Sequence, residues 1–135
     1  MSKKLSSNRG KNQKDLSKRI LDINQKLASV VQELSEIKGE GEIAAPGCWI
    51  VRYQAKGRGG RYWYYKWMAS EAIFINQKQQ RSKSKYIGKA GSETYLKAVS
   101  SLQRRGKIEA LERVIKVLSQ GLEDLVEEAT RGKKD

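Results

Sequence analysis

The side chains that most enzymes use for chemistry are scarce in this chain. Its 135 residues include no histidine and a single cysteine, Cys48. A Ser–His–Asp triad, histidine acid–base catalysis, a histidine-ligated zinc site and an intrachain disulfide are therefore excluded. The segment KGRGG holds glycines without the GxxxxGK[ST] spacing of a phosphate-binding loop. We therefore expect a protein that is not an enzyme and needs no cofactor.

One group of carboxylates raises the alternative of a metal site. Glu123, Asp124, Glu127 and Glu128 lie close together near the end of the sequence. A helix of a globular protein usually turns such a charged face toward solvent. We interpret the four residues as a solvated acidic face and expect no metal.

Positive charge and aromatic rings are concentrated in the same middle stretch. The chain carries 28 Lys and Arg against 15 Asp and Glu, a net charge of +13. Residues 41–91 hold ten basic and two acidic residues, and all ten aromatic residues lie between Trp49 and Tyr95. A clustered excess of cations indicates a polyanionic partner. Aromatic rings exposed among cations favour contacts with nucleic-acid bases.

Alternating β-forming residues predict a hairpin at the start of this stretch. Residues 48–54 and 61–68 are the expected strands, joined by the glycine-rich turn AKGRGG. Residues 71–76 are either a third strand or a continuation after a bend. Residues 77–84 have the composition of a basic loop, and residues 84–88 of another short strand.

Alternation divides the aromatic residues of the second strand between two faces. One set comprises Trp63, Tyr65 and Trp67, and the other comprises Tyr62 and Tyr64. We expect one set to be exposed and the other to pack on a helix that begins near Glu93, with Ser92 as its N-cap. On that helix the partners are Tyr95, Val99 and Leu102.

Two longer segments carry apolar residues spaced alternately by three and four. The first seam comprises Leu16, Ile20, Ile23, Leu27, Val30, Leu34 and Ile37. The second comprises Ile108, Leu111, Ile115, Leu118, Leu122 and Leu125. This spacing predicts amphipathic coiled-coil-like helices, paired as an antiparallel hairpin or in a dimeric four-helix bundle. The residues expected to pack helices or form a homodimer are Ile20, Ile23, Leu27, Val30, Leu34, Leu111, Ile115, Leu118 and Leu122.

The predicted fold class is α+β, a small antiparallel sheet of a hairpin plus a third strand, flanked by N- and C-terminal amphipathic helices. Near Gly106 we expect either one long helix with a phase shift or two helices in line. The predicted segments are a disordered basic arm (1–12), a helix (13–38), a linker (39–47), the basic–aromatic sheet with its helix (48–105), a second amphipathic helix (106–130) and a tail (131–135).

The middle stretch resembles a known kind of DNA-binding unit. In order, its segments are GCWIVRYQ, KGRGGRYWYYKW, KSKYIGKAG and SETYLKAVSSLQRR. They look like the arm-type DNA-binding unit of tyrosine recombinases and are similar to the AP2-type module over residues 47–105. The resemblance implies a three-stranded sheet braced by one helix and laid in the major groove. It implies groove-facing roles for Arg52, Arg58, Arg61, Tyr62, Tyr64 and Lys66. The chain departs from the pattern in its longer segment 69–83 and in lacking a recombinase catalytic domain.

These observations predict a non-enzymatic protein that binds duplex DNA with its sheet and dimerises through its helices. Such a protein could be a regulator or an accessory factor of a plasmid, phage or mobile element. The candidate nucleic-acid-binding residues are Arg52, Lys56, Arg58, Arg61, Tyr62, Tyr64, Lys66, Arg81, Lys83, Lys85 and Lys89. Two alternatives are a binder of RNA or single-stranded nucleic acid and a coiled-coil interaction adaptor.

The sequence shows no apolar segment of the kind that targets or anchors a chain to membranes. The N-terminal MSKKLSSNRGKNQKDLSKR lacks the apolar run of a secretory signal, and no stretch approaches about 18 consecutive apolar residues. We therefore expect a cytoplasmic protein without a membrane partner, nucleoid-associated if the organism is bacterial.

Overall fold

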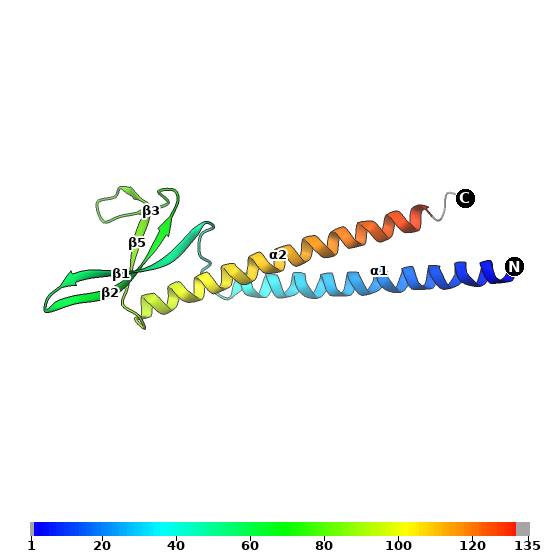
Figure 1. Cartoon of the computed structure of the whole chain (residues 1–135), viewed down its shortest axis with the longest axis horizontal. Coiled ribbons are helices and arrows are strands. Elements are labelled where there is room, and N and C mark those ends of the chain that lie inside the picture. Colours follow the sequence, from blue (N-terminus) through cyan, green and yellow to red (C-terminus); the bar gives the residue numbers. More distant parts are fainter. Residues whose placement is uncertain (1, 132–135) are drawn as a thin grey trace. The chain divides into compact units, whose positions relative to one another are not determined.

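The computed structural model describes the backbone of residues 2–131 and the side chains of residues 12–131. The elements are α1 (Ser2–Gly39), β1 (Cys48–Gly57), β2 (Gly60–Ala69), β3 (Phe74–Ile75), β4 (Arg81–Ser82), β5 (Ser84–Gly88) and α2 (Glu93–Arg131) (Figure 1). They divide into two compact units. We call α1 together with α2 from Ile108 onward the helical pair, and residues 40–107 the sheet unit. The predicted α+β class is confirmed.

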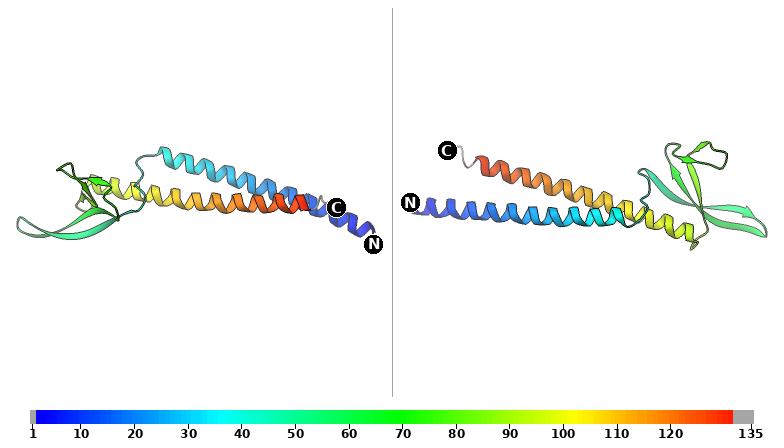
Figure 2. Two further views of the ribbon diagram at one scale, coloured as in Figure 1. Left: turned by 90° about the horizontal axis from the view of Figure 1, so that it is seen from above. Right: turned by 180° about the vertical axis from the view of Figure 1, so that it is seen from behind.

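In the helical pair α1 and α2 run antiparallel (Figure 2), and Arg19 of α1 lies 3.8 Å from Glu128 of α2. Every seam residue is buried or half-buried, with Val30 4% and Leu125 6% exposed. A Cβ added at Gly121 would lie 3.7 Å from Ile23 Cδ1, an ordinary van der Waals distance, so the two helices are in contact at this point and an alanine would also fit. Within one chain the seams therefore cover each other in part: Val30, Ile37, Ile108 and Leu125 are buried and the other nine seam residues are half-buried. Burial of these apolar side chains stabilises the pair.

α1 is longer than the sequence predicts. It begins at Ser2 rather than at residue 13, so residues 2–12 are helical where a disordered arm was expected. Adding residues to an existing helix costs far less than nucleating one. α2 runs unbroken through Gly106, so the first of the two expected arrangements, one long helix, is the one observed. One helical glycine costs only about 1 kcal/mol. Of the predicted tail, residues 132–135 lie outside the described part.

The predicted hairpin is confirmed, and its strands are longer than expected. β1 and β2 pair antiparallel from Cys48 opposite Ala69 to Gly57 opposite Gly60, leaving a two-residue turn. β5 joins β2 antiparallel, which gives a three-stranded sheet of order β1-β2-β5. Pairing between β2 and β5 covers only Tyr65–Met68, and its register shifts between Tyr65 and Lys66. The third strand of this sheet is therefore residues 84–88, not 71–76.

The segment between β2 and β5 forms a small hairpin of its own, where a loop was predicted over residues 77–84. β3 pairs with β4 as a separate two-stranded sheet. The Asn76 side-chain oxygen accepts hydrogen bonds from the backbone N–H groups of Lys78 (3.0 Å) and Gln80 (2.9 Å). This local bonding by an Asn side chain closes the turn that the composition alone did not reveal.

α2 packs on one face of the sheet through its first turns. The Ser92 hydroxyl accepts a hydrogen bond from the Tyr95 N–H at 3.2 Å, as the predicted N-cap. The Tyr65 and Tyr95 ring centroids are 4.8 Å apart. Trp67 and Leu102 pack on a core of Ala44, Cys48 and Ala69. Val99 and Trp63 were expected to pack between the sheet and the helix, but they lie outside this packing and are 39% and 46% exposed.

The linker before β1 is fixed to α2 by backbone and arginine hydrogen bonds. The Ala44 N–H donates to the Ser101 carbonyl at 3.1 Å. Arg104 donates to the Glu42 carbonyl at 2.9 Å, and Arg105 donates to the Ala45 carbonyl at 2.5 Å. These bonds hold the start of β1 against the helix, so the sheet rests on an anchored base.

Candidate nucleic-acid interface

The strand register assigns each side chain of the sheet to one of two faces. Residues directly opposite each other in an antiparallel pair project to the same side. The covered face, on which α2 packs, contains Cys48, Ile50, Arg52, Gln54, Lys56, Arg61, Trp63, Tyr65, Trp67 and Lys85. The open face contains Trp49, Val51, Tyr53, Ala55, Tyr62, Tyr64, Lys66, Met68 and Tyr86. On the open face, Tyr86 is 61% and Trp49 43% exposed.

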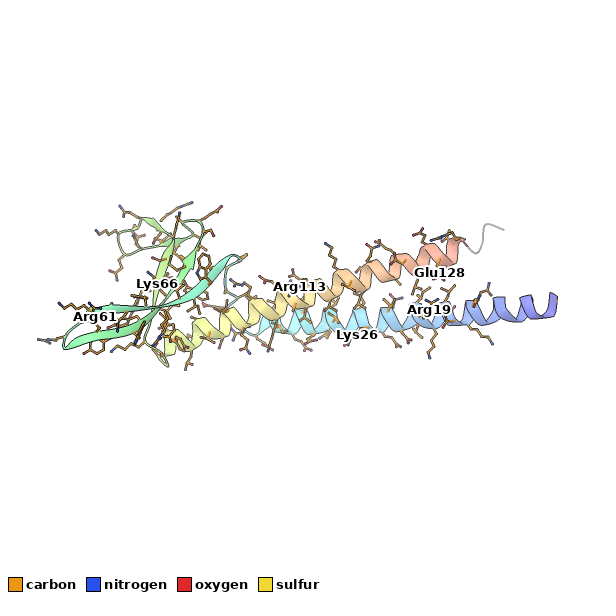
Figure 3. All side chains as sticks on the ribbon, viewed as in Figure 1. Arg19, Lys26, Arg61, Lys66, Arg113 and Glu128 are labelled. Carbon is orange, nitrogen blue, oxygen red and sulfur yellow. The ribbon has the colours of Figure 1, made fainter. Side chains whose placement is uncertain are left out.

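The far half of the hairpin extends beyond the third strand as a two-stranded ribbon (Figure 1). We define the ribbon as residues 52–64: β2 pairs only with β1 over Gly60–Tyr64, and Arg52 lies at the base, opposite Tyr65, where the third strand begins. Its cations are Arg52, Lys56, Arg58 and Arg61, all of them exposed. Arg61 projects near the ribbon tip in Figure 3, farther out than Lys66. The ribbon therefore carries a concentration of cationic side chains on a narrow support.

The tip of the ribbon is held in one conformation by Tyr62. The Tyr62 hydroxyl donates a 2.6 Å hydrogen bond to the Arg58 carbonyl. A Cβ added at Gly57 would lie 3.0 Å from the Tyr62 ring, so the ring packs directly on bare backbone. Gly59 has φ +86°, a conformation that other residues rarely adopt. Tyr62, expected to contact the ligand, is thus also part of the support for Arg58.

Arg52 lies at the base of the ribbon and is oriented by an aromatic ring. Its guanidinium carbon lies 3.6 Å from the centroid of the Trp63 ring, a cation–π geometry. Arg52 and Trp63 are both exposed. Stacking fixes the plane of the guanidinium and leaves its N–H donors available to an acceptor such as phosphate.

The open face presents a row of tyrosines that crosses all three strands. Tyr53 on β1 and Tyr64 on β2 have ring centroids 6.0 Å apart, and Tyr64 and Tyr86 on β5 are also 6.0 Å apart. Lys66 Nζ lies 4.7 Å from the Tyr53 centroid. Lys89 Nζ lies 5.0 Å from the Tyr62 centroid and 5.9 Å from that of Tyr64. We call Tyr53, Tyr64, Tyr86, Lys66 and Lys89 the tyrosine face.

Tyr53 of this face remains protonated at neutral pH. Partial burial raises the pKa of Tyr53 above its ordinary value, and the neighbouring Tyr86 and Tyr64 raise it further. A neutral phenol can donate a hydrogen bond and does not repel phosphate. The face also contains no carboxylate that would oppose an anionic ligand.

The cations of the sheet are not neutralised by carboxylates. Residues 43–92 contain ten basic residues and one acidic residue, Glu71. Among residues 12–131, the ion pairs of the structure join helix residues, as in Arg19 with Asp15 (3.0 Å) and Lys97 with Glu93 (3.2 Å). Like charges left unpaired at this density raise the electrostatic free energy of the fold, and a bound polyanion lowers it.

The structure divides the eleven predicted binding residues into three groups. Arg52, Lys56, Arg58 and Arg61 belong to the ribbon, and Tyr62, Tyr64, Lys66 and Lys89 belong to or adjoin the tyrosine face. Arg81 lies on β4, Lys83 precedes β5 and Lys85 lies on the covered face. Tyr53 and Tyr86 are not among the predicted residues, although a two-residue turn places Tyr53 opposite Tyr64 by counting alone.

The acidic cluster on α2 forms local contacts with helix residues. Glu127 pairs with Arg131 at 3.2 Å, and Glu128 pairs with Arg19 of α1 at 3.8 Å. Asp124 accepts a hydrogen bond from Gln120 at 3.3 Å. Within the described residues, no group of three His, Cys, Asp or Glu is placed to hold a metal ion. Over the same range, no helix combines the length and apolarity needed to cross a membrane.

Comparisons with models of known families, with curated proteins and with solved structures find no match to this chain. The function of the chain is therefore inferred from the chemistry of the sheet unit.

Proposed function

We propose that this protein is a non-enzymatic DNA-binding protein that inserts its β1–β2 ribbon into the major groove of a duplex. The observation that carries the proposal is the ribbon itself: an antiparallel hairpin with four exposed cations and no carboxylate. A two-stranded ribbon fits the width of the major groove. Cations on phosphates position such an element, and side chains at base edges give it sequence preference.

The dimensions of the ribbon suit this role. The part of β2 that pairs with β1 alone, Gly60–Tyr64, spans five residues. At about 3.3 Å per residue this is roughly 16 Å, longer than the groove depth of about 8.5 Å. The ribbon can therefore enter the groove while the base of the sheet stays outside. Lys56, Arg58 and Arg61 are then within reach of the phosphates that border the groove.

We keep homodimerisation through the helices as part of the proposal. Of the nine seam residues expected to pack helices or join two chains, Val30 is buried and the other eight are only half-buried within one chain. A second copy that completes a four-helix bundle would bury the surface that these eight residues still expose. Sedimentation equilibrium at several protein concentrations decides the oligomeric state. A single species of 15.3 kDa at all concentrations would remove the dimer from the proposal.

The proposed function is tested by duplex binding of a charge-removed ribbon. Fluorescence anisotropy with a labelled duplex compares wild type with Arg58→Ala/Arg61→Ala over a range of salt concentrations. We expect the double variant to bind roughly 10- to 100-fold more weakly and to lose about 2 from the slope of log K against log salt. The reason is that two phosphate contacts disappear.

The matched control removes two cations from the helical pair, Lys26→Ala/Arg113→Ala (Figure 3). It alters net charge by the same amount and should leave the affinity within about twofold of wild type. Equal weakening by both double variants would show that only net charge matters. Wild-type protein that does not bind duplex at about 0.1 M salt would overturn the proposed function.

A further inference from the structure

We propose that the tyrosine face binds an unpaired DNA strand, so that the preferred ligand is a duplex with an adjoining single-stranded tail. This inference rests on the proposed function, because it assigns the duplex to the ribbon and the tail to the neighbouring face. The two sites are connected through Tyr62, whose hydroxyl supports the ribbon tip and whose ring contacts Lys89 of the tyrosine face.

The composition of the tyrosine face differs from what a duplex groove requires. A duplex offers phosphates and base edges, because its base faces are covered by neighbours at a spacing of about 3.4 Å. The tyrosine face offers aromatic rings spaced by 6.0 Å across three strands. Rings stack on base faces, and only unpaired and unstacked bases expose those faces. The row therefore suits a strand whose bases are separated.

Exposure points to Tyr86 as the first stacking position. Its side chain is 61% exposed although it lies beside another tyrosine ring. Tyr53 and Tyr64 are half-buried in the same row, so they hold the row in place as well as extending it. A base stacked on Tyr86 would cover an aromatic surface that nothing in the described chain covers.

The two lysines of the face supply the contacts for the strand's backbone. The Lys66 and Lys89 ammonium groups lie against tyrosine rings and form no ion pair within the described residues. An ammonium group binds phosphate more strongly than it binds the face of a ring near the surface. When a strand arrives, the lysines move to its phosphates and uncover the rings of Tyr53 and Tyr64. The face then binds bases and phosphates together.

Three labelled DNA ligands test the inference: a blunt duplex, the same duplex with a single-stranded tail of about 6 nucleotides, and the tail strand alone. We expect the tail to raise the affinity of the wild type about tenfold over the blunt duplex. Tyr86→Ala should remove most of that gain and leave affinity for the blunt duplex unchanged. Tyr86→Phe keeps the ring and should retain the gain, which separates stacking from the hydroxyl.

Two controls keep the test decisive. Val117→Ala removes apolar surface from a 72%-exposed site on the helical pair and should change none of the affinities. Circular dichroism of Tyr86→Ala verifies that this variant folds. Lys89→Ala removes a phosphate contact rather than a ring, and it should also reduce the gain in affinity that the tail gives.

The outcomes separate this inference from the proposed function. Equal affinity for blunt and tailed duplexes overturns the tyrosine-face site and leaves duplex binding standing. Tight binding of the tail strand alone, without duplex binding, overturns the proposed function and retains the face as a single-strand site. A tail gain that survives in Tyr86→Ala and Lys89→Ala shows that the tail lies elsewhere and overturns the assignment.

Discussion

The helical pair and the sheet unit use the same kinds of side chain in opposite ways. The helical-pair segments contain 14 basic and 11 acidic residues, a net charge of +3, whereas residues 40–107 contain 14 basic and 4 acidic, a net charge of +10. In the helical pair, Arg19 and Arg131 lie beside carboxylates and the apolar residues close a seam. In the sheet, the cations of residues 43–92 form no ion pair within the described residues, and Tyr86 is 61% exposed. Charge in one region serves the fold, and in the other it is available to a ligand.

The largest expected effect on stability is in the seam of the helical pair. Leu125 is 6% exposed, and Leu125→Ala should lower the free energy of unfolding by about 2–5 kcal/mol through lost burial and a cavity. Urea unfolding followed by circular dichroism measures it. The exposed Val117→Ala should change stability by less than about 0.5 kcal/mol. If the two variants are equally stable, the seam is not the core of this region.

The sequence predicted the features that depend on neighbouring residues. The spacing of Leu16 to Ile37 identified the buried stripe of α1, and Ser92 identified the start of α2. Alternation identified the strands of the hairpin. Each of these features is determined by residues that lie within a few positions of one another in the sequence. Rules for local spacing and capping were therefore sufficient to predict them.

The features that the sequence did not predict depend on distant residues. Arg104 and Arg105 interrupt the apolar pattern of α2, and their hydrogen bonds to carbonyls about 60 residues earlier give the reason. Tyr86 joins the tyrosine row only because β5 pairs with β2 across the β3–β4 hairpin. The position of Tyr86 in the row cannot be read from residue spacing, because it is determined by which strands pair.

Removing one arginine from each region should have a smaller effect on stability and shows whether its charge stabilises the fold. Arg19 lies between Asp15 (3.0 Å) and Glu128 (3.8 Å), so Arg19→Gln should destabilise the fold by about 0.2–1 kcal/mol, as for an exposed pair. Arg61→Gln removes a cation from an unpaired cluster and should leave stability unchanged or slightly higher. Both are measured by urea unfolding at low salt. A loss of stability in Arg61→Gln equal to that in Arg19→Gln would contradict the distinction between the regions.

The smallest effect concerns alkaline pH and is confined to the sheet. Burial first, then Tyr86 and Tyr64, raise the pKa of Tyr53. The folded state therefore retains the Tyr53 proton better than the unfolded chain, whose tyrosines titrate near pH 10. The stability from this group is complete below that pH and is lost as pH rises through the folded pKa. Unfolding measured between about pH 9 and 11 should show this loss in the wild type and less of it in Tyr53→Phe. Identical pH profiles would contradict it.

The central claim is that the sheet unit binds DNA while the helical pair serves as its scaffold. The most direct test is a ¹H–¹⁵N NMR titration of the whole chain with duplex DNA, which reports on each backbone amide separately. The account predicts shifts or broadening concentrated in the ribbon, residues 52–64, with α1 and residues 108–131 unchanged. Shifts concentrated on the helical pair, or none anywhere at saturating duplex, would contradict it.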